Sequence, residues 1–591
     1  MLIGKYLNRF YLKYILFFIF GILALILVDY YQLEIPVICK NIVNGVIDAS
    51  LFDNASKMLD YMIYLGIIAL IMFIGRFTWR YCVLGVAARI EGDLREDMFI
   101  HAEKLSNQFY KENKTGALMA LFTNDLQMIR QAFGSGTIML IDAIFLGGFA
   151  LFRMFRSNWI LTCFCLIPLT LMAIVTIIVG RVMEQKFRLR QEAYDKLSDF
   201  SQENFSGIAV IKAFVKELNE IRHFDKLNQD NYVKNINYVR YATIINVLLG
   251  LVISTIFAVL FGVGAYFVVN DSVFNGVQFK SGELFEFIAY FDTLIWPFMA
   301  VAQLINMKAQ AKASYHRIEE FLNQRIDIVD KDIVDIDKIK GKIEFRNLTF
   351  KYPDGSNNVL QNISFTINSG EMVGIIGKTG CGKTTIVDLL LRTYNIEDNQ
   401  IFIDDKDIMH LPFKKVRDSI GYVPQDNFLF SDTISNNIGF AFEDINMDEI
   451  YKFASLADVH NNIIDFKDKY DTILGERGVT LSGGQKQRVS IARALIKKPS
   501  ILIFDDSVSA VDTKTEKTIL DNLKSIRRGM TTIMIAHRIS TVESLDKIIL
   551  LYDGKVSAIG THDELLKTSE LYREMVHLQS LQEEVEGGQN E

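Results

Sequence analysis

The stretch ILIFDDSVSAVD, Ile501 to Asp512, decides the fold of the second half of this chain. Four apolar residues followed by two carboxylates, Asp505 and Asp506, indicate a strand that is buried on both faces and ends in acidic side chains. Open α/β sheets bind their ligands beyond the carboxyl ends of such strands. The stretch therefore predicts an α/β domain whose ligand site includes both carboxylates.

A phosphate-binding loop lies upstream, in the sequence GKTGCGKTT from Gly377 to Thr385. Its glycines let the backbone turn N–H groups toward a polyphosphate at the start of the helix KTTIVDLLLRTY. We expect Lys383 to reach the β- and γ-phosphates, and the Thr384 hydroxyl to bind Mg²⁺ together with Asp505. The residues expected to contact the nucleotide are Gly377, Lys378, Thr379, Gly380, Cys381, Gly382, Lys383, Thr384 and Thr385.

The first half of the chain has the composition of a membrane domain. With 591 residues the chain is too long for one compact core, and its long apolar runs precede a charged, glycine-punctuated half. The runs that approach the roughly 20 residues of a bilayer crossing are Tyr14 to Val28, Tyr61 to Gly75, Phe133 to Phe155, Trp159 to Val179, Tyr241 to Asn270 and Leu284 to Met307. We therefore predict a multidomain membrane protein, with an all-α six-helix transmembrane domain followed by an α/β P-loop ATPase domain.

The distribution of basic residues gives the orientation in the membrane. Two long connections, between the second and third runs and between the fourth and fifth, are rich in Lys and Arg and are therefore expected in the cytoplasm, with the N-terminus. Their apolar residues recur at helical spacing, which predicts helices that continue out of the membrane. We expect short turns near Asn113 to Gly116 and near Phe205 to Gly207, which could dock onto a soluble domain.

Charge and cysteine usage exclude several classes of partner. A net charge of −7 without a long basic block argues against nucleic acid as a partner. The five cysteines show no spacing typical of a metal site. A helix N-terminus can lower the pKa of a thiol, but we favour Cys381 as a small packing residue.

Acidic residues within or beside the apolar runs are candidates for function, because ionisable groups at membrane depth are costly. They are Asp29, Glu34, Asp142, Glu286 and Asp292. Asp142 and Asp292 are the strongest candidates for a functional role, since apolar residues flank both. The alternative for these two is structural pairing with an Arg or Trp of a neighbouring helix. For Asp29 and Glu34 we expect a capping role at the end of the membrane span.

The sequence LSGGQ, Leu481 to Gln485, completes a set of motifs that resembles a known family. With the phosphate loop and Asp505, it makes the segment from about Gly341 to Ser580 similar to the nucleotide-binding domain of an ABC transporter. The six preceding runs resemble the membrane domain of an exporter-type half-transporter. The domains expected are a transmembrane domain at 1–310, a linker at 311–340, a nucleotide-binding domain at 341–580 and an acidic tail at 581–591.

The resemblance implies further site residues and a second subunit. It implies that Tyr352 stacks on adenine, that Gln425 approaches Mg²⁺ and the attacking water, and that His537 contacts the γ-phosphate. It implies that the signature contacts a nucleotide held by another half-transporter, through Ser482, Gly483, Gly484 and Gln485. Gly475 to Gly478 match a segment that touches the cytoplasmic turns, and Ser509 to Asp512 match a loop at the dimer interface.

Asp506 departs from the family pattern, which has Glu at this position. Asp keeps the charge but is one methylene shorter, and a misplacement of about 1 Å can cost on the order of a hundredfold in rate. The combination resembles the degenerate-site subunit of bacterial heterodimeric multidrug exporters, whose own ATP site is slow and whose signature completes the partner's site. A homodimer that hydrolyses ATP slowly with Asp506 is the alternative.

The expected function is ATP-driven export of small amphipathic molecules across the inner (plasma) membrane, with ATP and Mg²⁺ as cofactors. The N-terminus and the nucleotide-binding domain are expected in the cytoplasm. Export of a lipid, a peptide or a thiol metabolite is an alternative, and so is an ATP-gated membrane regulator without sustained turnover.

Overall fold

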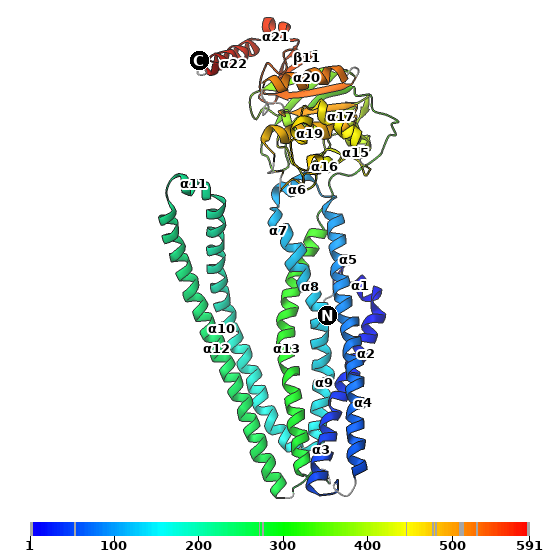
Figure 1. Ribbon diagram of the computed structural model, residues 1–591, viewed down its shortest axis with the longest axis vertical. Helices are drawn as coiled ribbons and strands as arrows, with labels where there is room; N and C mark the ends of the chain where they lie inside the picture. Colours follow the sequence, from blue (N-terminus) through cyan, green and yellow to red (C-terminus); the bar gives the residue numbers. More distant parts are fainter. Residues whose placement is uncertain are drawn as a thin grey trace. The chain divides into compact units, whose positions relative to one another are not determined.

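The computed structural model (Figure 1) describes residues 4–51, 55–270, 272–274, 277–444, 446–475, 478, 481–507, 513–526 and 530–587. The chain divides into two compact units. The first comprises residues 1–100 and 116–323, and the second comprises residues 101–115 and 324–591. The second unit thus includes part of the connection between the second and third predicted crossings.

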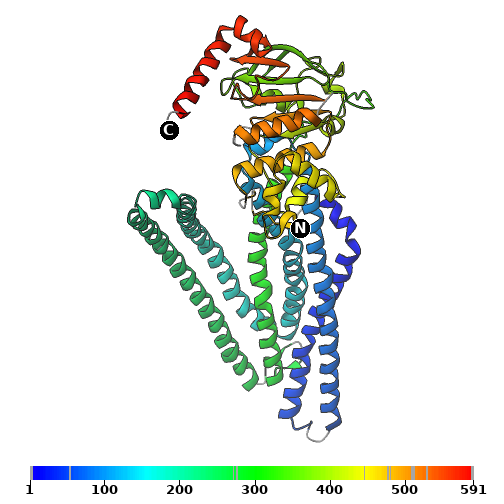
Figure 2. The same cartoon turned by 45° about the horizontal axis from the view of Figure 1, so that its top comes forward.

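The first unit is helical. Its helices are α1 (Asn8–Lys13), α2 (Ile15–Gln32), α3 (Glu34–Ile47), α4 (Ala55–Trp79), α5 (Gly85–Ala102), α7 (Thr115–Ala120), α8 (Leu126–Phe133), α9 (Ser135–Ser157), α10 (Trp159–Ser206), α11 (Ile208–Ala213), α12 (Glu217–Val269) and α13 (Ser281–Leu322), with single π-helical turns at Arg80–Leu84 and Leu121–Asp125 and short strands β1 (Val273–Phe274) and β2 (Val277–Gln278). Figures 1 and 2 show α10 and α12 running alongside each other, with α11 joining their ends.

Five helical segments of the described chain are long and apolar enough to cross a membrane. They are Ile15–Ile47, Ser56–Ala102, Thr115–Ser157, Glu217–Val269 and Ser281–Leu322. The fourth predicted crossing begins α10 with the apolar stretch Trp159–Pro168, but the side chains of residues 171–181 lie outside those that the structure describes. Asn158 starts this helix, because its side-chain oxygen accepts a hydrogen bond of 2.9 Å from the Leu161 N–H.

Short helices adjoin both of the predicted turns. Helix α5 ends at Ala102, and the extended Ser106 (φ −73°, ψ 158°) starts the separate helix α6 (Asn107–Glu112) before the predicted turn. Near the second turn, α10 ends at Ser206 and α11 occupies Ile208–Ala213. The sequence pattern thus located both reversals, but it did not distinguish a turn from a short transverse helix.

Most acidic groups of the first unit have basic or polar partners. Arg153 of α9 lies 2.5 Å from Glu34 and donates hydrogen bonds to the Leu33 carbonyl (2.9 Å) and the Tyr290 hydroxyl (3.3 Å). Glu286 pairs with Lys40 at 2.8 Å and accepts a hydrogen bond from Tyr290. These contacts join α3, α9 and α13, and they account for an arginine within an otherwise apolar segment.

Asp29 was expected to cap the end of a membrane span, and that expectation is wrong. It lies inside α2 and is only 3 % exposed, whereas Asp292, one of the two acids expected to be foremost, is exposed. Helix rotation decides which side chains face the interior, and the apolar runs around both acids do not encode it.

The second unit is an α/β domain. Its strands are β3 (Ile343–Phe350), β4 (Leu360–Ile367), β5 (Met372–Gly377), β6 (Ile401–Ile403), β7 (Lys406–Asp407), β8 (Ile420–Val423), β9 (Ile501–Asp505), β10 (Thr531–Ala536), β11 (Lys547–Tyr552) and β12 (Lys555–Gly560). Its helices are α6 (Asn107–Glu112), α14 (Lys383–Leu390), α15 (Phe413–Ser419), α16 (Ile434–Ile438), α17 (Met447–Leu456), α18 (His460–Ile464), α19 (Gly483–Ile496), α20 (Thr513–Ile526), α21 (His562–Thr568) and α22 (Glu570–Gly587), with 3₁₀ turns at Ile408–His410 and Lys469–Asp471.

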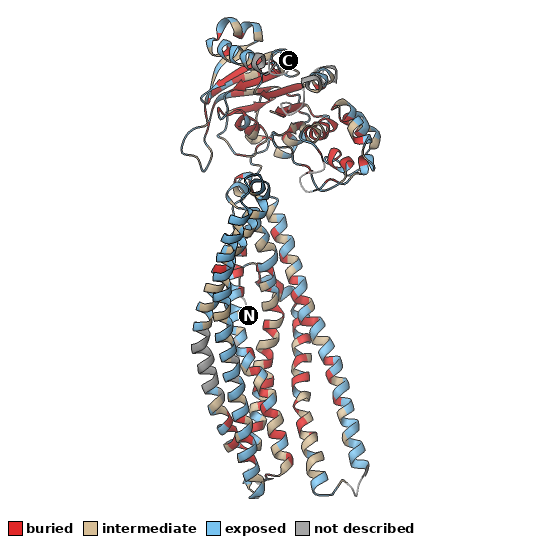
Figure 3. Ribbon diagram, turned by 60° about the vertical axis from the view of Figure 1, so that its left-hand side comes forward, coloured by how far each residue is buried: buried red, intermediate tan, exposed pale blue. Residues whose placement is uncertain are grey.

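Two sheets form this domain, one mainly parallel and one antiparallel. The larger sheet has the order β12-β11-β5-β10-β9-β8, in which only β12 pairs antiparallel, and the smaller has the order β4-β3-β6-β7. Figure 3 shows the buried residues concentrated in the strands. The predicted linker, residues 311–340, begins with the end of α13, and α22 continues past residue 581 into the predicted tail.

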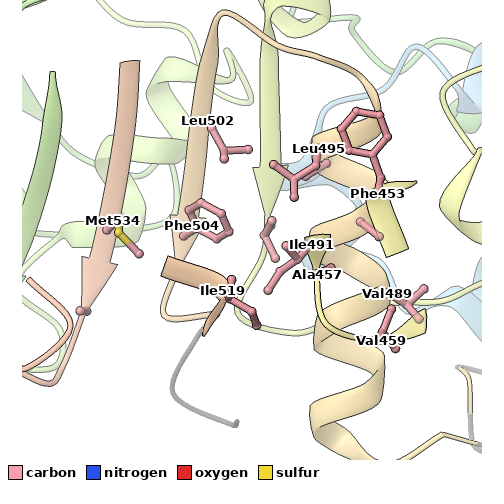
Figure 4. Packing of buried hydrophobic residues seen from close by; sticks show 14 of the residues in the cluster. Phe453, Ala457, Val459, Val489, Ile491, Leu495, Leu502, Phe504, Ile519 and Met534 are labelled. Atoms are coloured by element: carbon pink, nitrogen blue, oxygen red, sulfur yellow. The ribbon is translucent and has the colours of Figure 1, made fainter. Parts of the chain in front are cut away.

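Strand β9 is buried on both faces, as its sequence predicts. All five of its residues are buried. Leu502 and Phe504 belong to the cluster against α19 and α20, where Figure 4 shows them beside Ile491 and Ile519. Ile501 and Ile503 belong to a second cluster shared with the smaller sheet. Alternate side chains therefore serve two cores, which is why the run is uniformly apolar.

The buried Arg392 attaches the segment after α13 to the domain. Its side chain is 1 % exposed and donates to the Asp330 carboxylate (3.1 Å) and to the carbonyls of Leu411 (2.6 Å) and Val329 (3.3 Å). Replacing it leaves these acceptors buried or half-buried without their donor.

We predict that Arg392→Met lowers the free energy of unfolding of the second unit by about 3 kcal/mol. Arg346, which pairs with Glu344 and whose side chain is 51 % exposed, gives the matched control. Arg346→Met should change stability by less than about 1 kcal/mol. Urea unfolding of the full chain, followed by circular dichroism, measures both, and equal effects would contradict the assigned role of Arg392.

Candidate functional site

The candidate site lies at the carboxyl edge of the larger sheet. Strands β5, β8, β9 and β10 run parallel there, and the phosphate loop, Gln425, Asp506 and His537 follow them. A pocket of about 370 Å³ opens at this edge. The residues that line it are Tyr352, Val359, Thr379, Gly380, Gly382, Lys383, Thr384, Thr385, Gln425, Asp505, Asp506, Ile535 and His537. The sheet therefore brings together side chains that are up to 185 positions apart in the sequence, from Tyr352 to His537.

The phosphate loop folds around the ammonium group of Lys383. The Nζ atom donates hydrogen bonds to the carbonyls of Gly377 (2.9 Å) and Lys378 (3.1 Å), and burial lowers the pKa of this lysine. Gly382 has φ +97°, and a Cβ atom there would lie 2.6 Å from Leu360 Cδ2. Only glycine fits this position without strain, so the loop can begin α14 at Lys383, and the start of a helix attracts an anion.

Asp505 and Thr384 place oxygen atoms at one point beside the loop. The Thr384 hydroxyl donates to Asp505 Oδ1 at 3.1 Å, and the Tyr422 hydroxyl donates to Oδ2 at 3.4 Å. Asp505 is 1 % exposed, and burial raises the pKa of its carboxyl above the ordinary value. A hydroxyl and a carboxylate beside a phosphate loop are the donor set that Mg²⁺ prefers, so these residues fit that ion.

Asp506 occupies an uncommon backbone conformation next to His537. Its φ is +45°, and its N–H donates to the Ile535 carbonyl at 2.9 Å. Asp adopts this left-handed region more readily than longer side chains do. His537 Nε2 lies 3.9 Å from Asp506 Oδ2. Burial is the larger cause that lowers the pKa of this histidine, and the positive charge of nearby Lys383 is the second. Both favour the neutral imidazole.

Tyr352 is held by residues that the sequence did not single out. Its hydroxyl lies 3.0 Å from Thr385 Oγ1, and its ring packs edge-on against Tyr394, with centroids 5.1 Å apart. Lys111 of α6 lies over both rings, 5.3 Å from the Tyr352 centroid and 5.4 Å from that of Tyr394. The same ammonium group donates to the Tyr394 hydroxyl at 2.9 Å. Lys111 is 241 positions from Tyr352, and no local pattern links them.

The signature residues begin a helix elsewhere in the domain. Ser482 caps α19, because its hydroxyl accepts from the Gln485 N–H (3.3 Å) while Gln485 Oε1 accepts from the Ser482 N–H (3.0 Å). A Cβ atom on Gly483 would meet no other atom within 4 Å. Of the described residues that line the pocket, none belongs to the signature.

The remaining predicted site residues lie partly outside the pocket or outside the described chain. Cys381 is 6 % exposed, and burial raises the pKa of its thiol, which agrees with a packing role. Gly377 and Lys378 hold Lys383 through their carbonyls. Residues 509–512 lie outside the described residues, as do 476 and 477 within the segment from Gly475 to Gly478.

Comparison with known proteins decides the family. Residues 18–298 match the family of the ABC transporter transmembrane region, and residues 360–509 match the ABC transporter family. The chain is 36 % identical, over 99 % of both sequences, to a probable multidrug resistance ABC transporter ATP-binding/permease protein, YheI, of Bacillus subtilis (strain 168). This chain belongs to the ABC transporter family.

Two further relatives agree with this assignment. The multidrug resistance-like ATP-binding protein MdlA of Escherichia coli (strain K12) is 33 % identical over 95 % of this chain and 94 % of its own. A solved bacterial Atm1-family ABC exporter with ATP bound superposes with a TM-score of 0.74 and 25 % identity, over 97 % of this chain and 98 % of the other. The predicted fold class, a helical membrane domain followed by an α/β nucleotide-binding domain, is confirmed.

We predict that Lys111→Met weakens ATP binding by the nucleotide-free protein about threefold, because Tyr352 loses a cation–π contact. Tripolyphosphate, which has no base to stack, should bind the variant as it binds the wild type. Equilibrium dialysis of labelled ATP, with tripolyphosphate as competitor, measures both affinities. Lys114→Met, on an exposed residue of the same connection, is the control, and an equal loss of tripolyphosphate binding would contradict the role assigned to Lys111.

Proposed function

We propose that this chain is the degenerate-site half of a heterodimeric ABC exporter that moves small amphipathic molecules out of the cell. Relatives that cover nearly the whole chain are named multidrug resistance proteins, which supports export of such compounds. The protein is a multi-pass membrane ATPase by its family. We place it in the inner (plasma) membrane, with its N-terminus and nucleotide-binding domain in the cytoplasm, because the basic connections favour that orientation.

The observation that carries the proposal is Asp506 at the edge of the nucleotide pocket. A carboxylate after the Mg²⁺-binding Asp505 serves to orient or deprotonate the attacking water. Asp506 is one methylene shorter than Glu, and its backbone lies in the left-handed region, with φ +45°. Its carboxylate already lies near His537. We infer that this pocket binds ATP and releases it slowly, with little turnover.

The intact signature supports the second half of the proposal. Ser482 holds the start of α19 through the reciprocal hydrogen bonds with Gln485, and the N–H groups of a helix start attract a phosphate. A phosphate bound there must come with a nucleotide from another subunit, because the signature residues do not line the described part of this chain's own pocket. This chain would thus complete the partner's catalytic site.

The helical hairpin of α10, α11 and α12 supports the need for a second chain. In α11 and the residues after it, Val210 is 60 % exposed, Phe214 is 70 % exposed and Val215 is 81 % exposed. These side chains follow a cytoplasmic extension, where lipid cannot cover them. Exposed apolar side chains that adjoin one another mark a protein contact. A second half-transporter is the partner that the ABC family supplies.

The predicted site residues of the pocket have separate roles in binding ATP. Bound Mg²⁺, held by Thr384 and Asp505 with Gln425 nearby, would neutralise phosphate charge. Lys383 releases the two loop carbonyls to bind the β- and γ-phosphates, Tyr352 offers its ring to adenine, and His537 offers a neutral imidazole N–H to the γ-phosphate. ATP then joins two nucleotide-binding domains, and hydrolysis at the partner's site separates them.

The first test compares the chain alone with the chain assembled with a second half-transporter, such as the product of an adjacent reading frame. We expect ATP turnover by the chain alone at least about tenfold below that of the pair, because a misplaced base costs one to two orders of magnitude. Brisk turnover by the chain alone that is lost in Asp506→Asn would support the homodimer instead.

The second test is Asp506→Glu in the assembled pair. We expect the longer carboxylate to raise turnover at this chain's own site about tenfold or more. Single-turnover measurement with the partner's catalytic Glu changed to Gln isolates that site. A rate unchanged by Asp506→Glu would show that the side-chain length at this position is irrelevant.

A further inference from the structure

Two buried carboxylates and an indole meet within the membrane unit. Asp142 of α9 is 8 % exposed, and its Oδ2 atom accepts a hydrogen bond of 2.9 Å from Trp296 Nε1 of α13. Asp29 of α2 is 3 % exposed, and its Oδ2 atom has no hydrogen-bond partner among the described residues. Asp142 lies within electrostatic range of Asp29. We call Asp29, Asp142 and Trp296 the carboxylate–indole cluster.

The packing of three helices sets the position of the cluster. Helices α2 and α13 both pack on α9. The backbones of α9 and α13 approach closely where Gly147 faces Pro297, because a Cβ atom on Gly147 would lie 3.1 Å from Pro297 Cβ. This contact lies one residue from Trp296 and one and a half helical turns from Asp142. The indole is therefore held against α9, while 44 % of Trp296 remains exposed.

The carboxyl groups of this cluster have no basic partner among the described residues, unlike the two neighbouring acids Glu34 and Glu286. Glu34 pairs with Arg153, and Glu286 pairs with Lys40, each within 2.8 Å. For Asp29 and Asp142, no basic partner is present among the residues that the structure describes. Two carboxylates buried at membrane depth are costly unless a positive charge lies between them. Within the cluster, the Asp29 Oδ2 atom is the acceptor without a partner among the described residues.

We propose that the carboxylate–indole cluster binds the cationic head of a lipophilic organic ion. Two carboxylates supply the opposite charge, and the exposed face of Trp296 supplies a cation–π surface. Ca²⁺ and Mg²⁺ are disfavoured, because they take six or more oxygen ligands and the cluster offers few beside an indole. The inference rests on the proposed export function, because the exposed indole face gives an amphipathic cation its route to the carboxylates.

The test measures binding of tetraphenylphosphonium to the nucleotide-free transporter, assembled with its partner in lipid nanodiscs, by equilibrium dialysis. Neutral triphenylphosphine oxide is the comparator. We expect Asp29→Asn and Asp142→Asn each to weaken binding of the cation about tenfold, the effect of losing one partly desolvated charge, and to change binding of the neutral compound less than about twofold. Asp292→Asn is the matched control, because that acid is exposed on the same helix as Trp296, and it should bind both compounds as the wild type does.

Three results would overturn the proposal. They are unchanged affinity for the cation in both Asn variants, an equal loss of the cation and the neutral compound, and an equal loss of the cation in Asp292→Asn. If an Asn variant fails to assemble, two further variants test whether the cluster binds the cation. Asp142→Glu should keep the preference for the cation, and Trp296→Leu should lower it about threefold or more. The proposal would also be overturned if Asp142→Glu lost the preference for the cation, or if Trp296→Leu kept it in full.

The design separates this proposal from the proposed function. Binding is measured without nucleotide and therefore depends neither on Asp506 nor on turnover. If the cation binds with the expected dependence on Asp29 and Asp142 but ATP drives no movement of it in sealed vesicles, the export function fails and the binding site stands. If ATP drives transport of other compounds and the cation binds equally well to both Asn variants, the site fails and the function stands.

Discussion

The burial of the larger sheet on both faces is the constraint on which the nucleotide site depends. Side chains along β9 alternate between two apolar cores, so the strand has no position for a polar group until its last residue, Asp505. The parallel neighbours β5, β8 and β10 are also largely buried, although β10 begins with two buried threonines, Thr531 and Thr532. The polar groups of the site lie mainly in the loops at one edge, where the phosphate loop, Gln425, Asp506 and His537 converge.

The chain has two candidate functional surfaces, the nucleotide pocket and the signature at the start of α19. Its pocket holds the groups that bind a nucleotide, with Asp506 on a left-handed backbone that suits Asp better than Glu. Its signature is a capped helix start, which is proposed to bind the phosphate of a nucleotide held by the partner. In the proposed heterodimer, one chain thus retains ATP and also completes the site at which the partner hydrolyses it. Lys111 links the short helix α6 to Tyr352, the residue proposed to stack on adenine.

What the sequence predicted well was local. The buried strand, the phosphate loop and the capped signature each follow from a few consecutive residues, since apolar alternation, glycine conformation and capping act over one element. The contacts of Tyr352 were not predictable, because Lys111 and Tyr394 come from distant elements.

Among the membrane acids, the sequence anticipated the pairing of Asp142 with a tryptophan as one of two alternatives. It misplaced Asp29 and Asp292, whose burial depends on how each helix is rotated against its neighbours. The partner of Glu34 likewise required the packing of α3 against α9 and could not be read from either helix alone.

The most direct test of the account is to identify which chain retains ATP. The assembled pair is loaded with 8-azido-ATP labelled on the α-phosphate, allowed one turnover, quenched and photolysed, and the nucleotide on each chain is then analysed. The account predicts triphosphate on this chain and diphosphate on its partner. Diphosphate in equal amounts on both chains would contradict it, because both pockets would then hydrolyse ATP.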